Sequence, residues 1–257
     1  MEKVNFLGLS ISILTKETLI KYLINNVENN YNKICYGYSL GTVAFIDKMP
    51  EIHQYGEKFD LFVTDGRIFY LLAKFHGLKL KYDISIPNLV NLTLHLANEN
   101  KWSVYLLGAK QEVNDKAKTR IQNLYPHITK IEGHHGYFGN DYLDIMADLI
   151  DNQFNIVLIG ITSPLKEKIA LEFREKKCGN IIIPCGGMID VLSGNIKQAP
   201  NWAKKMGLAT LYRLSQEPLR LSKRYAYIYA KLFFIFLPKY VYHVVLRKNK
   251  SFSIINK

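Results

Sequence analysis

The sequence predicts an α/β fold, in which a parallel sheet carries helices on both faces, followed by a basic, aromatic and helical C-terminal appendage. Short apolar runs rich in β-forming residues alternate with stretches of helical periodicity, which is typical of a parallel sheet. The apolar runs stop after about Gly194, and the remaining chain is basic and helical in pattern. We therefore expect an α/β domain over 1–195 and an appendage over 196–257.

Six apolar runs are the predicted strands of this Rossmann-like sheet. They span 33–39, 59–66, 102–108, 128–133, 154–161 and 180–187. The N-terminal stretch 1–17 predicts a first strand rather than a signal peptide, because it lacks a small-residue cleavage site. Between the strands, 68–77 predicts a helix that stops at Gly77, and 140–152 predicts an amphipathic helix.

Composition narrows the possible partners and the compartment. The chain has 257 residues, and 34 Lys and Arg against 22 Asp and Glu give a formal net charge of +12, which favours an anionic partner. Three cysteines without a CxxC pair fit a reducing compartment. No segment reaches the roughly 20 uninterrupted apolar residues of a membrane-spanning helix. We expect no nucleic acid, cofactor or metal, and the oligomeric state, including a homo-oligomer, stays open.

Small or polar residues stand where four of the predicted strands should stop: Thr64-Asp65-Gly66, Gly108-Ala109-Lys110, Thr162-Ser163 and Gly186-Gly187. In open parallel sheets the ligand crevice lies at the carboxyl ends of the strands, and small residues there let backbone N–H groups approach a phosphate. This pattern favours an anionic, nucleotide-like ligand, although glycine is common in such turns for conformational reasons alone. The glycine spacing fits neither GxGxxG nor a P-loop, so a nicotinamide-dependent oxidoreductase is not supported.

Several single residues admit two interpretations. Asp65 precedes a predicted helix, so it is either an N-cap or a general base at the mouth of the crevice. His134-His135 has no further metal ligand at an obvious spacing, which favours a loop role. Cys185 is interpreted as a small buried residue rather than a nucleophile.

Three arginines stand in what the pattern predicts to be one helical stretch. Arg213 and Arg220 are seven residues apart and Arg220 and Arg224 four apart, so they can share a helix face with Lys223. Such a face is either solvated or a clamp for a diphosphate, which guanidinium groups bind well.

The segment 157–225 resembles the WecG/TagA/CpsF glycosyltransferase family. The residues that carry the resemblance are Ser163-Pro164 with Glu167-Lys168, then GGMIDVLSGNIKQAPNW over 186–202 and GLATLYRLSQEPLRLSKRY over 207–225. TDG over 64–66, LLGAK over 106–110 and GHHGYF over 133–138 precede them in the family's order.

The resemblance implies a metal-independent, inverting transfer of an N-acetylmannosamine-type or glucose-type sugar from a UDP-sugar to a polyprenyl-diphosphate-linked acceptor. By the same resemblance Asp65 is the catalytic base, and Arg213, Arg220 and Arg224 complete the active site. We expect the following residues to bind substrate or nucleotide: Thr64, Gly66, Gly108, Lys110, Ser163, Lys166, Glu167, Gly186, Gly187 and Asp190. The polymer would be a bacterial surface polysaccharide or teichoic acid.

Three stretches depart from the family pattern. Gly37-Tyr38-Ser39-Leu40 stands where the family often has T-x-N-P, and 83–88 stands in place of R-V-x-G-x-D. Lys166 replaces the usual Gln after S-P-K. These departures leave open whether the chain is an enzyme or a non-catalytic, membrane-associated nucleotide-binding or scaffold protein.

The apolar and aromatic stretch 225–237 is too short to span a membrane and contains Lys231, and Pro238 and Lys239 separate it from a further apolar run over 240–246. Aromatic residues flanked by Lys and Arg are typical of a helix that lies on a bilayer. We therefore expect 220–248 to dock on an anionic membrane surface, which places the protein in the cytoplasm, peripheral on the inner face of the bacterial plasma membrane.

Overall fold

A computed structural model gives the structure of the protein and describes residues 2–138, 145, 149, 153–246 and 253. The predicted helix over 140–152 therefore lies outside the described residues, apart from Ile145 and Leu149. Both of these side chains are buried in the core.

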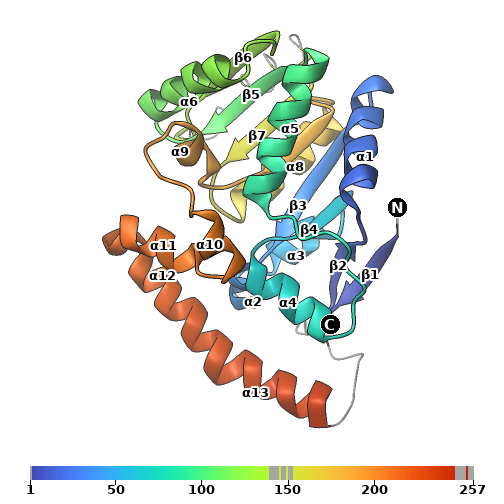
Figure 1. Cartoon of the computed structure of the whole chain (residues 1–257), viewed down its shortest axis with the longest axis vertical. Helices are drawn as coiled ribbons and strands as arrows, with labels where there is room; N and C mark the ends of the chain where they lie inside the picture. The colour runs from blue at the N-terminus through green and yellow to red at the C-terminus, as the bar shows by residue number, and fades with distance from the viewer. Residues whose placement is uncertain (1, 139–144, 146–148, 150–152, 247–252, 254–257) are drawn as a thin grey trace.

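The centre of the fold is a parallel sheet of six described strands in the order β4-β3-β8-β7-β5-β6 (Figure 1). The strands are β3 Lys33–Tyr38, β4 Leu61–Thr64, β5 Ser103–Gly108, β6 Lys130–His134, β7 Ile156–Gly160 and β8 Ile181–Pro184. Five of these strands lie within the predicted runs, and β6 overlaps the predicted run 128–133. The predicted α/β sheet is therefore confirmed. Parallel strands buried on both faces need continuous apolar sequences, and IVLIG in β7 is such a sequence.

Alternate residues of the strands enter two hydrophobic cores, one on each face. Ile156 and Leu158 of β7 pack on one face, where α1 (Lys16–Glu28), α5 (Ile86–Asn100) and α6 (Gln111–Leu124) cover the sheet. Val157 and Ile159 enter the opposite core, which α8 (Leu165–Glu175) covers. The side-chain period of two in a strand produces this division.

The N-terminal prediction was wrong in part, because the first residues form a separate hairpin and not a strand of the main sheet. β1 (Lys3–Phe6) and β2 (Leu9–Ser12) pair antiparallel as a two-stranded sheet. Leu7 and Gly8 both have positive φ, +57° and +91°, and this tight turn folds the chain back on itself. The Ser12 hydroxyl accepts a hydrogen bond of 3.0 Å from the Phe62 N–H, so the hairpin rests against β4.

Helices follow the carboxyl ends of β3 and β4. α2 (Leu40–Phe45) follows β3, α3 (Glu51–Gly56) leads into β4, and α4 (Arg67–Phe75) follows β4. Ser39 and Thr42 form a capping box at the start of α2. Gly77 has a φ of +97° directly after α4, which confirms the predicted helix stop.

After β8 the described chain is helical, as predicted. The elements are α9 Met188–Leu192, α10 Asn201–Lys205, α11 Ala209–Gln216, α12 Pro218–Lys231, η1 Leu232–Phe236, α13 Leu237–Tyr240 and η2 Val241–Leu246. In Figure 1 α12 and α13 run past α2 and α4, away from the sheet. Phe45 of α2 packs on Tyr227 with ring centroids 5.0 Å apart, and Tyr240 lies 3.3 Å from His76.

One expectation for this segment was wrong. The described chain continues through Pro238 as one 29-residue helix over Pro218–Leu246. π-helical turns stand on both sides of α13, and such wider turns can accommodate a proline within a helix. By length and hydropathy this one helix of the described residues is also sufficient to cross a membrane, contrary to our expectation that no segment would be.

Candidate active site

Asp65 lies at the carboxyl edge of the sheet, directly after β4. Its N–H donates a 2.7 Å hydrogen bond to the Tyr38 carbonyl at the end of β3. Its Oδ1 accepts a 3.0 Å hydrogen bond from the Ile86 N–H at the start of α5. Gly66 is the N-cap of α4 and no side chain caps that helix, so the N-cap interpretation of Asp65 was wrong.

The surroundings of Asp65 suit a group that accepts a proton. Burial raises the pKa of its carboxyl above the usual value, while the Ile86 N–H and then the charges of Lys166 and Arg213 lower it. A carboxylate with a raised pKa is a stronger base, and nearby cations keep it ionised. Asp65 thus has the electrostatic setting of a general base.

Two hydroxyl groups hold the side chain of Glu167, the third residue of α8. Its Oε1 accepts hydrogen bonds of 2.7 Å from both the Tyr36 and the Ser163 hydroxyls. The Lys166 ammonium lies 3.7 Å from the same oxygen. Because the Glu167 side chain is fully buried, these contacts bring β3, α8 and the turn after β7 together at one point.

Arg213 and Arg220 meet at Glu217. The Arg220 guanidinium binds the Glu217 carboxylate with two hydrogen bonds of 2.7 Å, and Arg213 Nε lies 3.6 Å from Glu217 Oε2. The predicted single helix was wrong here, because Glu217 has φ −134° and ψ 55° and separates α11 from α12. The bend, rather than a shared helix face, brings the two arginines together.

Arg213 also reaches the turn after β8. Its guanidinium lies where a side chain at Gly187 would stand, so a glycine is required at that position for Arg213 to approach. Asp190 of α9 is the next acid along this turn. Burial raises the pKa of Asp190, and the charges of Arg220 and Arg213 counteract that effect. Five of the predicted residues are therefore linked electrostatically: Asp65, Lys166, Asp190, Arg213 and Arg220.

Arg224 lies one turn further along α12 and is exposed. Its guanidinium stands 5.9 Å from the ring centroid of Phe45, on α2. It is therefore placed beside α2, on the helix that leads to the apolar C-terminal half.

The remaining residues that were predicted to bind substrate differ in their backbone conformation and in their burial. A side chain at Gly108 would overlap the Gly160 carbonyl, so this glycine allows β5 and β7 to end close together. Gly66 and Gly186 have φ of +104° and +57° with open space around them, as a ligand-facing turn requires. Thr64 is buried at the end of β4, and Lys110 is the exposed N-cap of α6.

Two of the stretches that depart from the family pattern contact each other. A Cβ atom at Gly37 would lie 2.5 Å from Ile86 Cγ1 and 3.0 Å from Asp65 Cβ. A side chain at residue 37 would therefore force the Ile86 side chain to shift. Nearby, Asp83 forms a 2.7 Å ion pair with Arg67 of α4.

All three cysteines are buried, and burial raises the pKa of Cys185 to about 12, which agrees with its interpretation as a small buried residue. His134 ends β6, and its ring lies at a tilt to that of His135, with the two ring centroids 4.1 Å apart. Among the described residues no group of three His, Cys, Asp or Glu side chains could hold a metal ion.

Sequence reasoning missed Tyr36, Ile86 and Glu217 as site residues. Tyr36 and Ile86 read as ordinary apolar positions, and their contacts to Glu167 and Asp65 span 131 and 21 residues. Glu217 could have been found, because it stands between the two arginines in the stretch that carries the family resemblance.

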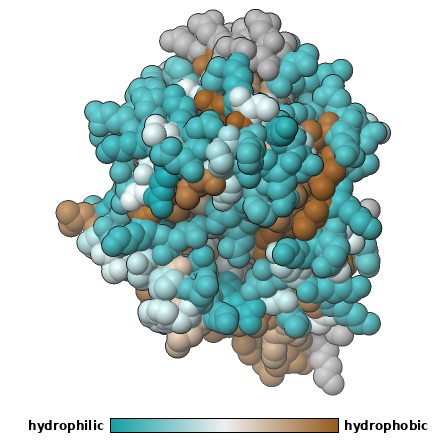
Figure 2. Space-filling model, turned by 45° about the horizontal axis from the view of Figure 1, so that its top comes forward, coloured by the Kyte–Doolittle hydropathy of each residue, from teal (hydrophilic) through white to brown (hydrophobic). Residues whose placement is uncertain are grey.

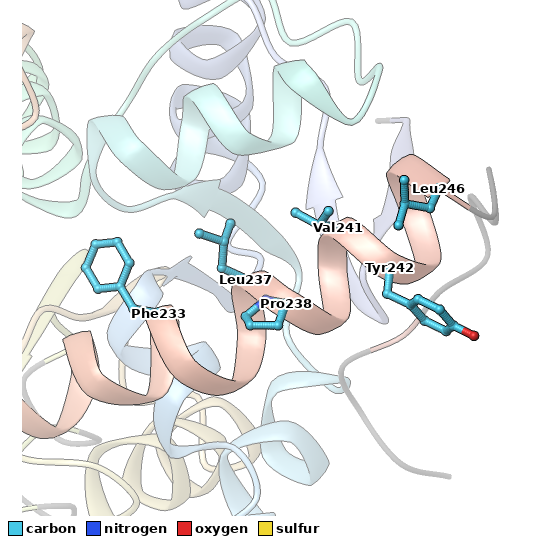
Figure 3. Close-up of a pocket in the computed structure, with 6 residues that line it drawn as sticks. All are labelled: Phe233, Leu237, Pro238, Val241, Tyr242 and Leu246. Atoms are coloured by element: carbon cyan, nitrogen blue, oxygen red, sulfur yellow. The ribbon is translucent and has the colours of Figure 1, made fainter.

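The outer face of the C-terminal helix is apolar and exposed. Phe234 is 81% exposed and Leu246 69%, while Ile228, Phe236 and Tyr240 on the inner face are buried. In Figure 2 hydrophobic surface gathers at the lower end of the molecule, the end at which Figure 1 places this helix. Figure 3 shows Phe233, Leu237 and Val241 on successive turns of one side, where they line a shallow groove.

Comparison with known proteins places these features in a family. Residues 4–249 match the model of the glycosyl transferase WecG/TagA/CpsF family. The chain is 26% identical over 189 residues, 74% of its length, to an N-acetylglucosaminyldiphosphoundecaprenol N-acetyl-beta-D-mannosaminyltransferase of Bacillus subtilis, of which 69% is covered. A counterpart of the same name in Bacillus spizizenii is 24% identical, with 75% of this chain and 70% of that protein covered.

A third relative transfers a different sugar. It is the UDP-Gal:alpha-D-GlcNAc-diphosphoundecaprenol beta-1,4-galactosyltransferase of Shigella boydii, 24% identical over 218 residues, with 81% of this chain and 91% of that protein covered. The sugar named for these relatives therefore varies, while a diphosphoundecaprenol-linked GlcNAc is common to the three names.

Proposed function

From the premise that this chain belongs to the glycosyl transferase WecG/TagA/CpsF family, we propose that it is an inverting hexosyltransferase for a bacterial surface polysaccharide or teichoic acid. The donor is a UDP-sugar of N-acetylmannosamine or glucose type. The acceptor is a sugar linked to polyprenyl diphosphate, the kind of acceptor that the names of three relatives state. The observation that carries the proposal is the buried carboxyl group of Asp65 at the carboxyl edge of the sheet, where the positive charges of Lys166 and Arg213 act on it.

In the proposed reaction Asp65 takes the proton from the acceptor hydroxyl. The oxygen of that hydroxyl forms a bond to the anomeric carbon while the bond from this carbon to the UDP oxygen breaks. UDP leaves with the electron pair, and attack from the opposite side inverts the anomeric centre. A positioned base of this kind contributes about 10²- to 10⁴-fold to a rate.

Arginine side chains are proposed to stabilise the departing UDP. Arg213 and Arg220 lie at the turn after β8, and their guanidinium groups suit diphosphate oxygens. In the structure both arginines contact the carboxylate of Glu217. The pKa of Glu217 is lowered mainly by its hydrogen bond to Arg220, so the two guanidinium groups already stabilise an anion. We propose that these side chains supply the positive charge and that the transfer does not depend on a metal ion.

The same proposal places the protein in the cytoplasm, on the inner face of the plasma membrane. The exposed apolar face of Pro218–Leu246 would lie in the interfacial region, with the cations of α12 against anionic lipid head groups. This position would bring Arg220 and Arg224 to the surface where a lipid-linked acceptor resides. The predicted docking segment ends at 248, and its last two residues lie outside the described part of the chain.

A donor screen tests the activity. Purified full-length protein is incubated with UDP-N-acetylmannosamine, UDP-glucose or UDP-galactose and a short-chain lipid-diphosphate-linked GlcNAc, and the lipid product is detected by mass spectrometry. We expect product with one donor. UDP binding without any product from the three donors would favour the non-catalytic alternative.

Metal independence is tested in the same assay. We expect the rate with the active donor to stay within about twofold when EDTA is added, because side chains supply the charge. Full loss of product in EDTA, with recovery on addition of Mg²⁺ or Mn²⁺, would count against the arginine assignment.

A further inference from the structure

Lys231 is the one charged residue of the stretch 225–237, and its side chain faces the rest of the protein. This side chain is only 12% exposed, whereas Phe234, three residues further along, is 81% exposed. The Lys231 ammonium donates a hydrogen bond to the carboxylate of Asp47, 184 residues earlier in the chain. It also lies 3.5 Å from the Tyr227 hydroxyl, one turn back on α12. The cation of the apolar helix is therefore used for a contact within the molecule.

Aromatic contacts surround this ion pair. Phe45, the last residue of α2, packs on the ring of Tyr227, and Asp47 follows two residues later. The Lys48 ammonium lies 4.1 Å from the centroid of the Tyr227 ring, within the range of a cation–π contact. Residues four apart on a helix share a face, so Tyr227 and Lys231 meet the end of α2 together. We call these five side chains the helix anchor: Phe45, Asp47, Lys48, Tyr227 and Lys231.

α2 is itself fixed to the candidate active site. Its N-cap, Ser39, directly follows Tyr38 at the end of β3, and the capping box with Thr42 holds the start of the helix. The Tyr38 carbonyl accepts the hydrogen bond from the Asp65 N–H. A helix of six residues therefore connects the edge where Asp65 lies with the helix anchor.

α12 carries two of the predicted active-site arginines. Arg220 and Arg224 stand seven and three residues before Tyr227 on the same helix. The Arg224 guanidinium lies 5.9 Å from the ring centroid of Phe45, so this arginine borders the helix anchor directly. An α-helix rises about 1.5 Å per residue with a fixed turn, so the place where α12 rests on α2 sets where both arginines stand.

We propose that the helix anchor positions the arginines of α12, because holding this helix against α2 keeps Arg220 and Arg224 where the transfer requires them. Asp47 and Lys231 are positioning residues, since neither is assigned a contact with substrate. The kinetic part of this inference rests on the proposed function, whereas the attachment of the helix rests on the contacts alone. Pairing with Asp47 also leaves the outer face of the helix apolar.

Charge reversal tests the helix anchor and includes its own rescue. Lys231→Glu places two carboxylates against each other, and Asp47→Lys places two ammonium groups there. The double variant, Asp47→Lys with Lys231→Glu, restores an ion pair of the opposite sense. Lys239→Glu is the matched control, because Lys239 is an exposed lysine of the same 29-residue helix.

Hydrogen exchange of the full chain, followed by mass spectrometry, reports the attachment without any substrate. We expect the amides of 218–246 to exchange about tenfold faster in each single reversal, because an attraction is replaced by a repulsion of similar size. The double variant and Lys239→Glu should exchange like the wild type. The strands of the sheet should keep wild-type exchange in every variant, which separates release of the helix from general unfolding.

Transfer to a short-chain, water-soluble acceptor reports the position of the arginines, since no membrane takes part. Phe45→Ala combined with Lys231→Glu also removes the ring contact, and the helix should then lose its protection. In this variant we expect kcat/KM with the active donor to fall about 10- to 100-fold, because positioned positive charge is lost. The double charge reversal should recover most of the rate that each single reversal loses.

Three results would overturn the inference. The first is wild-type exchange of 218–246 in both single reversals. The second is a double charge reversal that exchanges as fast as the single variants, which would show that Asp47 and Lys231 are not partners. The third is full transfer activity in a variant whose helix has lost its protection. A wild-type chain that turns over no donor would count against the proposed function, and the exchange pattern would still decide how the helix is attached.

Discussion

The carboxyl edge of the sheet and the outer face of the C-terminal helix differ in the kind of contacts that their side chains make. At the edge, buried polar groups have specific partners, such as the two hydroxyl groups on Glu167 and the Ile86 N–H on Asp65. On the helix, large apolar side chains such as Phe233 and Phe234 face outward. The polar groups of the sheet edge are held in place by specific hydrogen bonds, whereas the helix exposes apolar surface that makes no specific contacts.

This difference indicates how the two regions divide the work that we propose. Placement to within a fraction of an ångström serves a proton transfer, and apolar area serves adsorption to a bilayer. Glu217 joins the regions, because it binds Arg220 of α12 and lies against Arg213 of α11. Changes at the edge should therefore alter chemistry, and changes on the outer face should alter location.

The largest effect is expected for Asp65→Asn. The Asn oxygen can still accept the hydrogen bond from the Ile86 N–H, so the fold should persist. The side chain can no longer accept the acceptor's proton, and we expect the rate of transfer to fall by about 10²- to 10⁴-fold. Steady-state kinetics with UDP binding measured by calorimetry checks this, and an unchanged rate would remove Asp65 from the mechanism.

The same variant should be more stable than the wild type at high pH. The folded-state pKa of Asp65 is raised by burial, so its ionisation costs stability once the pH exceeds that pKa. The melting temperature of Asp65→Asn should exceed that of the wild type at about pH 8, and the gap should close as the pH falls through the pKa of Asp65. A gap that widens toward low pH would contradict the assignment.

A smaller effect, on location rather than chemistry, is expected for Phe233→Ser with Phe234→Ser. Each side chain contributes about 1.5–3 kcal/mol when its apolar surface leaves water, so binding to anionic vesicles should weaken more than tenfold. Flotation with phosphatidylglycerol liposomes measures it. Leu124→Ser, an exposed apolar position on α6, is the control and should float like the wild type.

Activity on a water-soluble acceptor separates an effect on membrane binding from an effect on the transfer reaction. The double serine variant should retain most of its rate on a short-chain acceptor and lose it on a long-chain acceptor in vesicles. Equal flotation of the double variant and the wild type would show that this face does not bind the bilayer.

The smallest effect is expected where Gly37 meets Ile86. Gly37→Ala places a methyl group 2.5 Å from Ile86 Cγ1, and overpacking of this kind costs about 1–3 kcal/mol. Ile86→Ala removes the overlapping atoms, so Gly37→Ala should be less destabilising in that background. Urea unfolding of the four proteins measures the coupling, and strictly additive free energies would show that the two residues do not constrain each other.

The sequence by itself determined the sheet and the end of it that carries the site. The six apolar runs became strands, and β4, β5, β7 and β8 are almost wholly buried because their sequences are continuously apolar. Small residues at the ends of four of the runs mark the carboxyl edge. Asp65 and the turn at Gly186-Gly187 were found in this way, since the signal lies in residues next to each other in the chain.

Only the tertiary structure decided how these residues are used. The hairpin at residues 3–12, the bend at Glu217 and the continuous helix through Pro238 depend on backbone angles that the residue pattern did not reveal. The roles of Tyr36 and Lys166 depend on contacts between β3 and α8, which are about 130 residues apart. Periodicity reports which face of an element is buried, but the partner of a buried polar group is chosen by packing across the sheet, and no local pattern encodes it.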